Sequence, residues 1–299
     1  MASKRFKPWY LLLLALANFI WAAQGTAVKI LESKLGPIAI TFVPFWITTL
    51  LLVPLLLRNP NPVKPTKRDW ISFFIAGVGG QVLAQLGMTW GITRSLASNA
   101  AILNLLIPVI SAVLASLMLH EKLTRLRCVS FVIGLVGVLL MSVEDLRHSA
   151  FLDSKMLSGN LLILAGCAGS SFYNVYCKGL MQRFQEVEIL IYSYIFASLA
   201  SIPLLIWVEP FSFHALAAFD LKSWMAFAFL AIFMYGVSML LFFYVLQFLD
   251  VTLASLSLYL VPVFGVILGA TLLGERLSPL AIAGAVVVLG ATILIMQFE

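Results

Sequence analysis

The chain alternates long uncharged apolar stretches with short segments that carry all of its Asp, Glu, Lys and Arg residues. A transmembrane helix needs about 17 to 25 mostly apolar residues, and ten stretches reach or approach that length. They cover residues 8–28, 35–57, 70–93, 95–119, 128–143, 156–177, 189–208, 223–249, 251–274 and 277–298. The pattern predicts an all-α integral membrane protein with ten transmembrane helices. The short fifth span can extend if Arg125 and Arg127 reach the membrane interface.

The second half of the chain repeats the first half at an offset of 154 residues. Pro108 then aligns with Pro262, and the sequence LHEKL at 119–123 aligns with LGERL at 273–277. Each half contains five predicted spans, and an odd number gives the second copy the opposite orientation in the membrane. We therefore expect two domains, residues 1–148 and 149–299, that form inverted five-helix repeats around a central cavity.

Polar residues inside six of the predicted spans gather on single helix faces. Such residues are costly in a membrane unless they face the bundle interior or a cavity. The stripes are Asn18, Trp21 and Gln24; Gln81, Gln85 and Thr89; Asn104, Pro108 and Ser111; Ser170, Tyr173, Asn174 and Cys177; Tyr235 and Ser238; and Ser255 and Tyr259. Together they predict one polar and aromatic cavity, while an interhelical hydrogen bond is the alternative for each single residue.

Two prolines and two glutamates occupy equivalent positions in the two halves. Pro108 and Pro262 lie near the middle of spans four and nine, where proline kinks a helix, and we predict a gating role for both. Glu121 and Glu275 close the same spans on opposite sides of the membrane, each followed by a basic residue. They are interpreted either as peripheral gates or as ion pairs that fix the loops.

Small residues four positions apart allow helix backbones to approach closely. Such pairs are Gly87 and Gly91, Ser111 and Ala115, and Gly265 and Gly269. We expect them to pack within one monomer, with contact across a homodimer as the alternative.

Composition and charge exclude several functions. Of the 299 residues, 62% are hydrophobic and 11% charged, and the mean hydropathy is +1.04, whereas soluble domains carry about 25% charge. The net charge of +6 arises from basic residues between the spans, without the continuous basic face that nucleic acid requires.

With the N-terminus in the cytoplasm, twelve of the 19 Lys and Arg residues lie on that side, so we expect both termini there. The run at 8–28 is long enough to span the membrane, which favours a first helix over a cleaved signal peptide.

Charged residues and histidines are missing from the middle of the spans. The three histidines lie in loops and the carboxylates at span ends, which argues against a deep proton-carrying carboxylate. Cys128, Cys167 and Cys177 share no metal-ligand spacing. We therefore expect no metal and no cofactor, and without convergent catalytic groups a membrane-embedded enzyme is disfavoured.

These features resemble the drug/metabolite transporter superfamily, specifically its EamA type of ten-helix bacterial exporters. The resemblance lies in the paired repeats, the stretch from Trp21 to Lys29, the Asn- and Ala-rich entry to span four before Pro108, and the LHEKL and LGERL helix ends. Ala22 and Ser170 depart from the glycine and tryptophan usual in the family. The resemblance implies a basket of helices one, three, four, six, eight and nine around a substrate cavity, with helices five and ten peripheral.

The sequence thus predicts a secondary transporter that exports small organic metabolites or drugs across a bacterial inner membrane by alternating access. The absence of buried charge favours neutral or zwitterionic solutes, amino acids and aromatic molecules included. The predicted substrate-binding residues are Trp21, Gln24, Gln85, Asn104, Tyr173, Asn174, Tyr235 and Tyr259. A passive channel is the nearest alternative. We expect a monomer surrounded by lipid, with a homodimer as the alternative.

Overall fold

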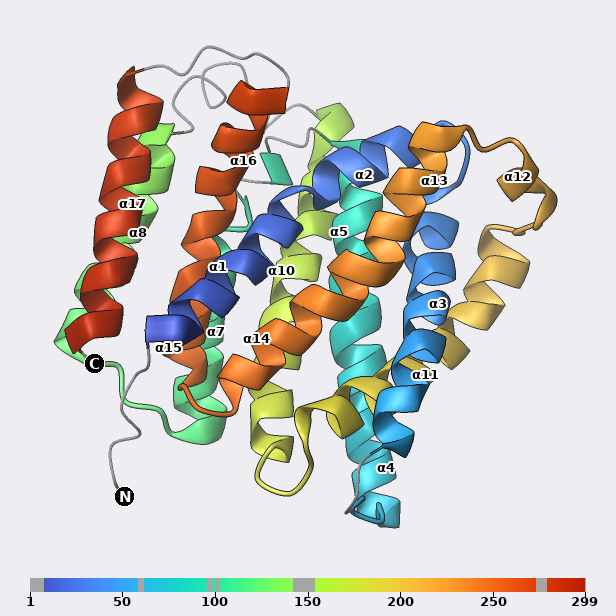
Figure 1. The fold of residues 1–299 in the computed structure, drawn as a ribbon, viewed down its shortest axis with the longest axis horizontal. Helices are drawn as coiled ribbons and strands as arrows, with labels where there is room; N and C mark the ends of the chain where they lie inside the picture. Colours follow the sequence, from blue (N-terminus) through green and yellow to red (C-terminus); the bar gives the residue numbers. More distant parts are fainter. Residues whose placement is uncertain are drawn as a thin grey trace.

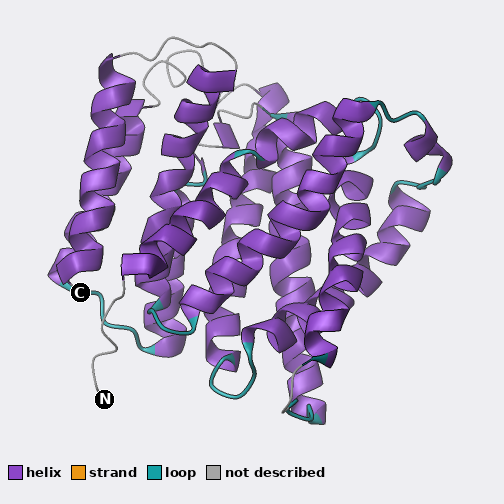
Figure 2. Cartoon of the chain, viewed as in Figure 1, coloured by secondary structure: helices purple, strands orange, loops and turns teal. Residues whose placement is uncertain are grey.

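The computed structural model describes residues 8–58, 62–95, 99–100, 103–141, 154–272 and 279–298, which form helices and turns without a strand (Figures 1 and 2). The predicted apolar stretches are predominantly helical wherever they are described. In the described part of the chain, six helices are long and apolar enough to cross a membrane: Pro8–Leu31, Pro37–Leu57, Lys67–Arg94, Met156–Leu180, Glu186–Val208 and Leu221–Leu246. Membrane crossing by the four shorter segments stays a prediction.

The first half contains α1 (Pro8–Ala22), α2 (Gln24–Leu31), α3 (Pro37–Leu57), α4 (Lys67–Phe74), η1 (Ile75–Val82), α5 (Leu83–Arg94), α7 (Leu106–Leu119) and α8 (Arg125–Met141). The second half contains α10 (Ser154–Leu180), α11 (Glu186–Pro203), η2 (Leu204–Val208), α12 (His214–Ala217), α13 (Leu221–Ala228), η3 (Phe229–Val237), α14 (Ser238–Leu246), α15 (Val251–Leu256), η4 (Ser257–Tyr259), α16 (Leu260–Leu272) and α17 (Pro279–Phe298). The elements α4, η1 and α5 are one continuous helix, as are α13, η3 and α14.

Two of these long helices contain π-helical segments at equivalent positions. The segment η1 starts at Ile75, and η3 starts 154 residues later at Phe229. π-Helical turns are rare and occur frequently at functional sites. Both segments contribute a side chain to the central cavity described below, Gln81 from η1 and Met234 from η3.

The helices that contain Pro108 and Pro262 are interrupted at equivalent positions. A proline ring clashes with the carbonyl four residues earlier, and these carbonyls belong to Asn104 and Leu258. The first half has a turn at Asn104 and Leu105, and the second has the 3₁₀ turn η4. The prolines are therefore the third residues of α7 and α16, so the predicted kinks take the form of breaks that precede them.

The helices α5 and α10 pack closely through glycines. A Cβ atom added at Gly87 would lie 2.8 Å from the backbone N of Gly166 and 2.8 Å from the carbonyl O of Leu162. At Gly91 it would lie 2.9 Å from the carbonyl O of Gly159. These two glycines pack within the monomer as predicted, whereas no atom of the described residues lies within 4 Å of such a Cβ at Gly265.

The helices α8 and α17 pack on each other at one edge of the bundle (Figure 1). A Cβ atom added at Gly137 of α8 would lie 3.0 Å from the carbonyl O of Gly284 in α17. The pair of α5 and α10 packs on α7 and η1 through α10, and on α3 and α2 through α5.

Candidate functional site

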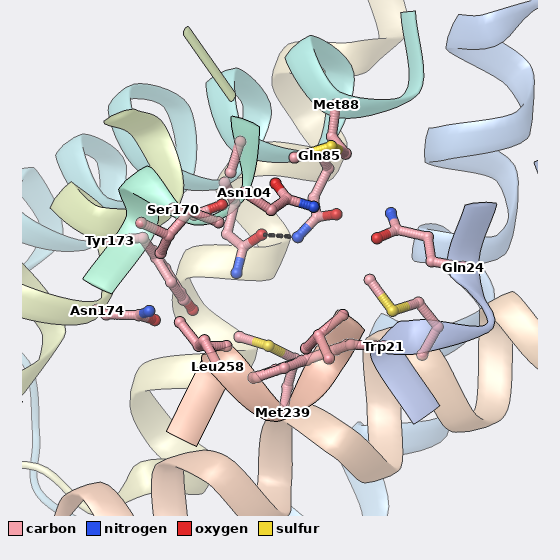
Figure 3. A pocket seen from close by; sticks show the side chains of 15 residues that line it. Trp21, Gln24, Gln85, Met88, Asn104, Ser170, Tyr173, Asn174, Met239 and Leu258 are labelled. Carbon is pink, nitrogen blue, oxygen red and sulfur yellow. Dashed lines mark hydrogen bonds between the residues drawn. The ribbon is translucent and has the colours of Figure 1, made fainter. Parts of the chain in front are cut away.

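A cavity of about 100 Å³ lies where the two halves of the chain meet (Figure 3). Its lining comes from α1, α2, η1, α5, the segment at 104–107, α10, η3, α14, η4 and α16. The lining residues are Trp21, Gln24, Gln81, Ala84, Gln85, Met88, Asn104, Ile107, Ser170, Tyr173, Asn174, Met234, Met239, Leu258 and Val261. These elements belong to predicted spans one, three, four, six, eight and nine, the same spans that carry the polar stripes.

Amide side chains form much of the polar lining. The Nε2 atom of Gln85 donates to Oε1 of Gln81 at 3.1 Å, one turn away on the same helix. Nε2 of Gln24 is buried and has no hydrogen-bond partner among the described residues. A buried donor of this kind is costly when unpaired, so the cavity provides a hydrogen-bonding position for an acceptor atom on a solute.

The break before α7 places Asn104 at the cavity. Its Oδ1 atom accepts from the thiol of Cys167 at 3.5 Å, and Cys167 lies in α10. The hydroxyl of Ser171, also in α10, donates to the carbonyl O of Ile107 at 3.1 Å. Side chains of α10 therefore satisfy groups near the break, as irregular backbone inside a membrane requires.

The helix α10 contributes three polar residues to the lining. Ser170 lies beside Asn104 in Figure 3, and Asn174 lies farther along the lining, beyond Tyr173. Tyr173 also lines the cavity, but its hydroxyl is paired with Oγ of Ser193 at 2.8 Å. Tyr173 thus offers the cavity ring surface, while its hydroxyl ties α10 to α11.

Two residues predicted to bind substrate do not line the cavity. The ring of Tyr235 packs 5.3 Å from that of Phe45, and its carbonyl O accepts from the hydroxyl of Tyr194 at 2.9 Å. The ring of Tyr259 lies against α8, because a Cβ atom added at Gly134 would be only 2.5 Å from a carbon of that ring. The other six predicted residues lie together in the lining.

Several lining residues were not predicted because they are apolar. They are Ala84, Met88, Ile107, Met234, Met239, Leu258 and Val261. A signal for two of them exists in the repeat, since Met239 and Leu258 follow the predicted residues Gln85 and Asn104 by 154 residues. A residue at the repeat position equivalent to a predicted lining residue is therefore itself a candidate for the cavity lining, whether it is polar or apolar.

Glu121 joins the two halves at one end of the bundle. Its carboxylate accepts from the backbone N of Val251 at 2.8 Å and from the backbone N and hydroxyl of Thr252 at 3.0 and 2.6 Å. These donors lie at the start of α15, where a negative charge is favoured by the helix dipole. His120, at φ 57°, provides the turn between α7 and Glu121. Glu275, the equivalent residue, lies outside the described residues.

The same end carries two further contacts on the loop between α14 and α15. The guanidinium of Arg127 in α8 pairs with Asp250 at 2.7 Å. Nζ of Lys178, at the end of α10, donates to the carbonyl O atoms of Leu246 and Leu249 at 2.6 and 3.0 Å. We call Glu121, Arg127, Lys178 and Asp250 the loop-anchoring network. It lies at the end of the bundle where α17 finishes (Figure 1).

An ion pair also joins the halves at the other end. Nζ of Lys34 lies 3.4 Å from Oδ1 of Asp220, which caps α13 by accepting from the backbone N of Ser223 at 2.9 Å. The hydrogen bonds from Ser223, with that from Lys34, lower the pKa of Asp220 to about 2. Asp220 is therefore ionised throughout the physiological pH range. The described residues contain no cluster of three or more His, Cys, Asp or Glu that could hold a metal ion.

Both halves of the chain match the EamA-like transporter family, over residues 8–143 and 157–297. The chain therefore belongs to this family, a group of multi-pass membrane proteins of the drug/metabolite transporter type. Membership indicates a small-solute transporter rather than an enzyme.

Relatives that match over most of their length are named as transporters, and two of them are named for different solutes. A transporter from Archaeoglobus fulgidus is 25% identical, covering 97% of this chain and 99% of its own length. A probable terminal-alkyne amino-acid exporter from Streptantibioticus cattleyicolor is 23% identical over 94% of this chain and 91% of its own. An S-adenosylmethionine uptake transporter from Rickettsia prowazekii is 24% identical over 97% and 92%.

A solved crystal structure supports the fold. It matches with a TM-score of 0.76 and 17% identity, and the match covers 95% of this chain and 97% of that one. At this identity the likeness concerns the arrangement of helices and carries no information on substrate.

Proposed function

We propose that this protein is a secondary carrier that exports neutral or zwitterionic small organic solutes, foremost amino acids, across a bacterial inner membrane. The supporting observation is the cavity, where uncharged amides and Trp21 lie between the two halves of the chain. Amides can orient a polar solute by hydrogen bonds, while apolar surface provides contact area. The binding residues in this proposal are Trp21, Gln24, Gln85, Asn104, Tyr173 and Asn174.

The absence of charge from the described lining favours this solute class. An anionic or cationic solute without a compensating charge would lose its hydration at high cost, whereas a zwitterion can satisfy its groups with amides and backbone. One relative is named as a probable amino-acid exporter. Another is named for uptake, so the direction of transport rests on the present proposal alone.

The mechanism we propose is alternating access between two inverted repeats, residues 1–148 and 149–299. With both termini in the cytoplasm, the loop-anchoring network faces the cytoplasm and closes that side of the cavity. Glu121 holds α15, which continues through the break at η4 toward Pro262. The equivalent break before Pro108 would serve the outer side, with Glu275 as its anchor.

Counterflow in proteoliposomes tests the proposed function. Vesicles loaded with one unlabelled amino acid at a time are given the labelled compound outside and compared with empty vesicles. Saturable uptake that is stimulated by internal solute is expected of a carrier. Uptake that neither saturates nor responds to internal solute would identify a passive channel. No uptake of any amino acid by folded protein would exclude the amino-acid class.

The cavity amides give a first mutational prediction. Gln85→Leu removes a hydrogen-bonding group at nearly constant size, and one buried hydrogen bond is worth about 1–3 kcal/mol when its partner is left unpaired. The external solute concentration for half-maximal counterflow is expected to rise about tenfold. Thr292→Val removes a buried hydroxyl from α17, outside the cavity lining, and serves as the control. Equal half-saturation in both variants would remove Gln85 from the binding site.

A further inference from the structure

The side of the cavity that carries the amides faces a side formed by apolar residues alone (Figure 3). One side, which we call the amide wall, contains Gln85, Asn104 and Ser170 from α5, the turn before α7, and α10, with Met88 beside Gln85. The opposite side, the methionine wall, contains Met234, Met239, Leu258 and Val261 from η3, α14, η4 and α16. Trp21 stands at the edge of the methionine wall, where its ring centroid lies 5.2 Å from that of Phe242.

The two walls contain equivalent positions of the repeat. Met239 follows Gln85 by 154 residues, and Leu258 follows Asn104 by the same number. Asn104 and Leu258 also occupy the equivalent helix breaks. The two halves therefore place residues at equivalent backbone positions of the cavity. At these positions the first half has hydrogen-bonding side chains, and the second half has a thioether and an aliphatic side chain.

The methionine wall has the properties of a surface for a flexible apolar group. Met234 and Met239 are 4% and 6% exposed, so most of their surface is packed and their remaining surface faces the cavity. Methionine is unbranched and polarisable, and it adapts to apolar partners of different shapes. No polar side chain of the described lining comes from α14, η4 or α16.

We propose that the cavity binds an amphipathic solute in one orientation, with its polar end on the amide wall and its apolar side chain on the methionine wall. Met239 and Leu258 are then specificity-determining residues that select the apolar side chain. This inference rests on the proposed function and narrows its solute class to amino acids with extended apolar or thioether side chains. Gln85 and Asn104 bind the polar end, which all amino acids share.

A homologous series of amino acids tests the division directly. Alanine, 2-aminobutyrate, norvaline and norleucine have the same polar end and differ by one methylene at a time. Burial of each methylene is expected to strengthen binding about fourfold. Dissociation constants of the purified protein follow from the concentration dependence of its thermal stabilisation, a measurement that does not require transport.

We expect the gain in affinity per methylene to change only in variants that make the methionine wall polar. Met239→Gln copies the residue at the equivalent position of the amide wall and should reduce the gain per methylene to twofold or less. Met239→Leu keeps the wall apolar and should retain a gain near fourfold. Gln85→Leu should weaken all four ligands by a similar factor. Met181→Gln, in the turn after α10 and outside the lining, controls for an added amide.

Two outcomes would overturn the inference. One is an equal gain per methylene in wild type and Met239→Gln, and the other is the absence of binding by every member of the series. Failure of the proposed function gives a different result, namely a normal binding series without counterflow. If an unrelated solute gave counterflow and no member of the series bound, the protein would still be a carrier. The proposed binding of amino acids between the amide wall and the methionine wall would then be excluded.

Discussion

Gly87→Ala is expected to destabilise the folded protein by about 1–3 kcal/mol, the range for an added methyl group in a well-packed core. The added Cβ would lie 2.8 Å from the backbone N of Gly166 and 2.8 Å from the carbonyl O of Leu162. Neither backbone atom can rotate away as a side chain would, so α5 and α10 must separate. The higher helix propensity of alanine, about 1 kcal/mol, offsets only part of this cost.

The separation would also affect binding, because α5 and α10 both supply side chains to the cavity lining. Gln85 and Met88 lie on α5, and Ser170 and Asn174 lie on α10. Thermal unfolding of the purified variant in detergent measures the stability. The matched control is Gly290→Ala in α17, where an added Cβ has no neighbour within 4 Å, and it should be neutral or stabilising. Similar melting temperatures for Gly87→Ala and Gly290→Ala would show that the two helices have room to adjust.

Glu121→Ala is expected to lower the maximal rate of counterflow tenfold or more while changing the solute dissociation constant less than threefold. The variant removes three hydrogen bonds to the start of α15, together with a favourable charge at a helix N-terminus. The cavity lies away from this contact, so binding should persist. The closed arrangement of the proposed cytoplasmic side would be destabilised, and the transport cycle would slow.

Chemical labelling separates a gating role from loss of folding. Ser170→Cys places a thiol in the cavity of a variant that lacks the exposed Cys128, and an impermeant maleimide applied from the cytoplasmic side should label it faster when Glu121 is alanine. Lys122→Ala changes the adjacent exposed side chain and should alter neither rate nor labelling. Unchanged transport in Glu121→Ala would favour the alternative that this carboxylate only fixes the loop.

The sequence predicts most of the architecture because a bilayer imposes simple demands. Long uncharged stretches must be helical in lipid, and these stretches are predominantly helical where they are described. Polar residues inside such stretches must avoid lipid, which explains why six of the eight predicted binding residues lie in one lining. An apolar lining residue cannot be predicted in this way, because residues such as Met239 and Leu258 are equally stable in the protein core and in contact with lipid.

The two residues outside the lining are both found where the helix is not an α-helix. Tyr235 lies in η3 and Tyr259 in η4. A π-helical turn is wider than an α-turn and a 3₁₀ turn is narrower, so each changes the direction in which the side chain leaves the axis. The predicted faces assumed 3.6 residues per turn throughout. Hydropathy carries no information about these local changes of pitch.

The placement of the two π-helical segments bears on the history of the chain. Since both halves match one family, we use the same position in each half as the criterion for a feature that both could inherit from one duplicated segment. The segments η1 and η3, which begin 154 residues apart, meet that criterion. The residues at Gln85 and Met239 do not, because their chemistry differs. The helix geometry is thus common to the two halves, whereas the chemistry that faces the cavity is particular to each.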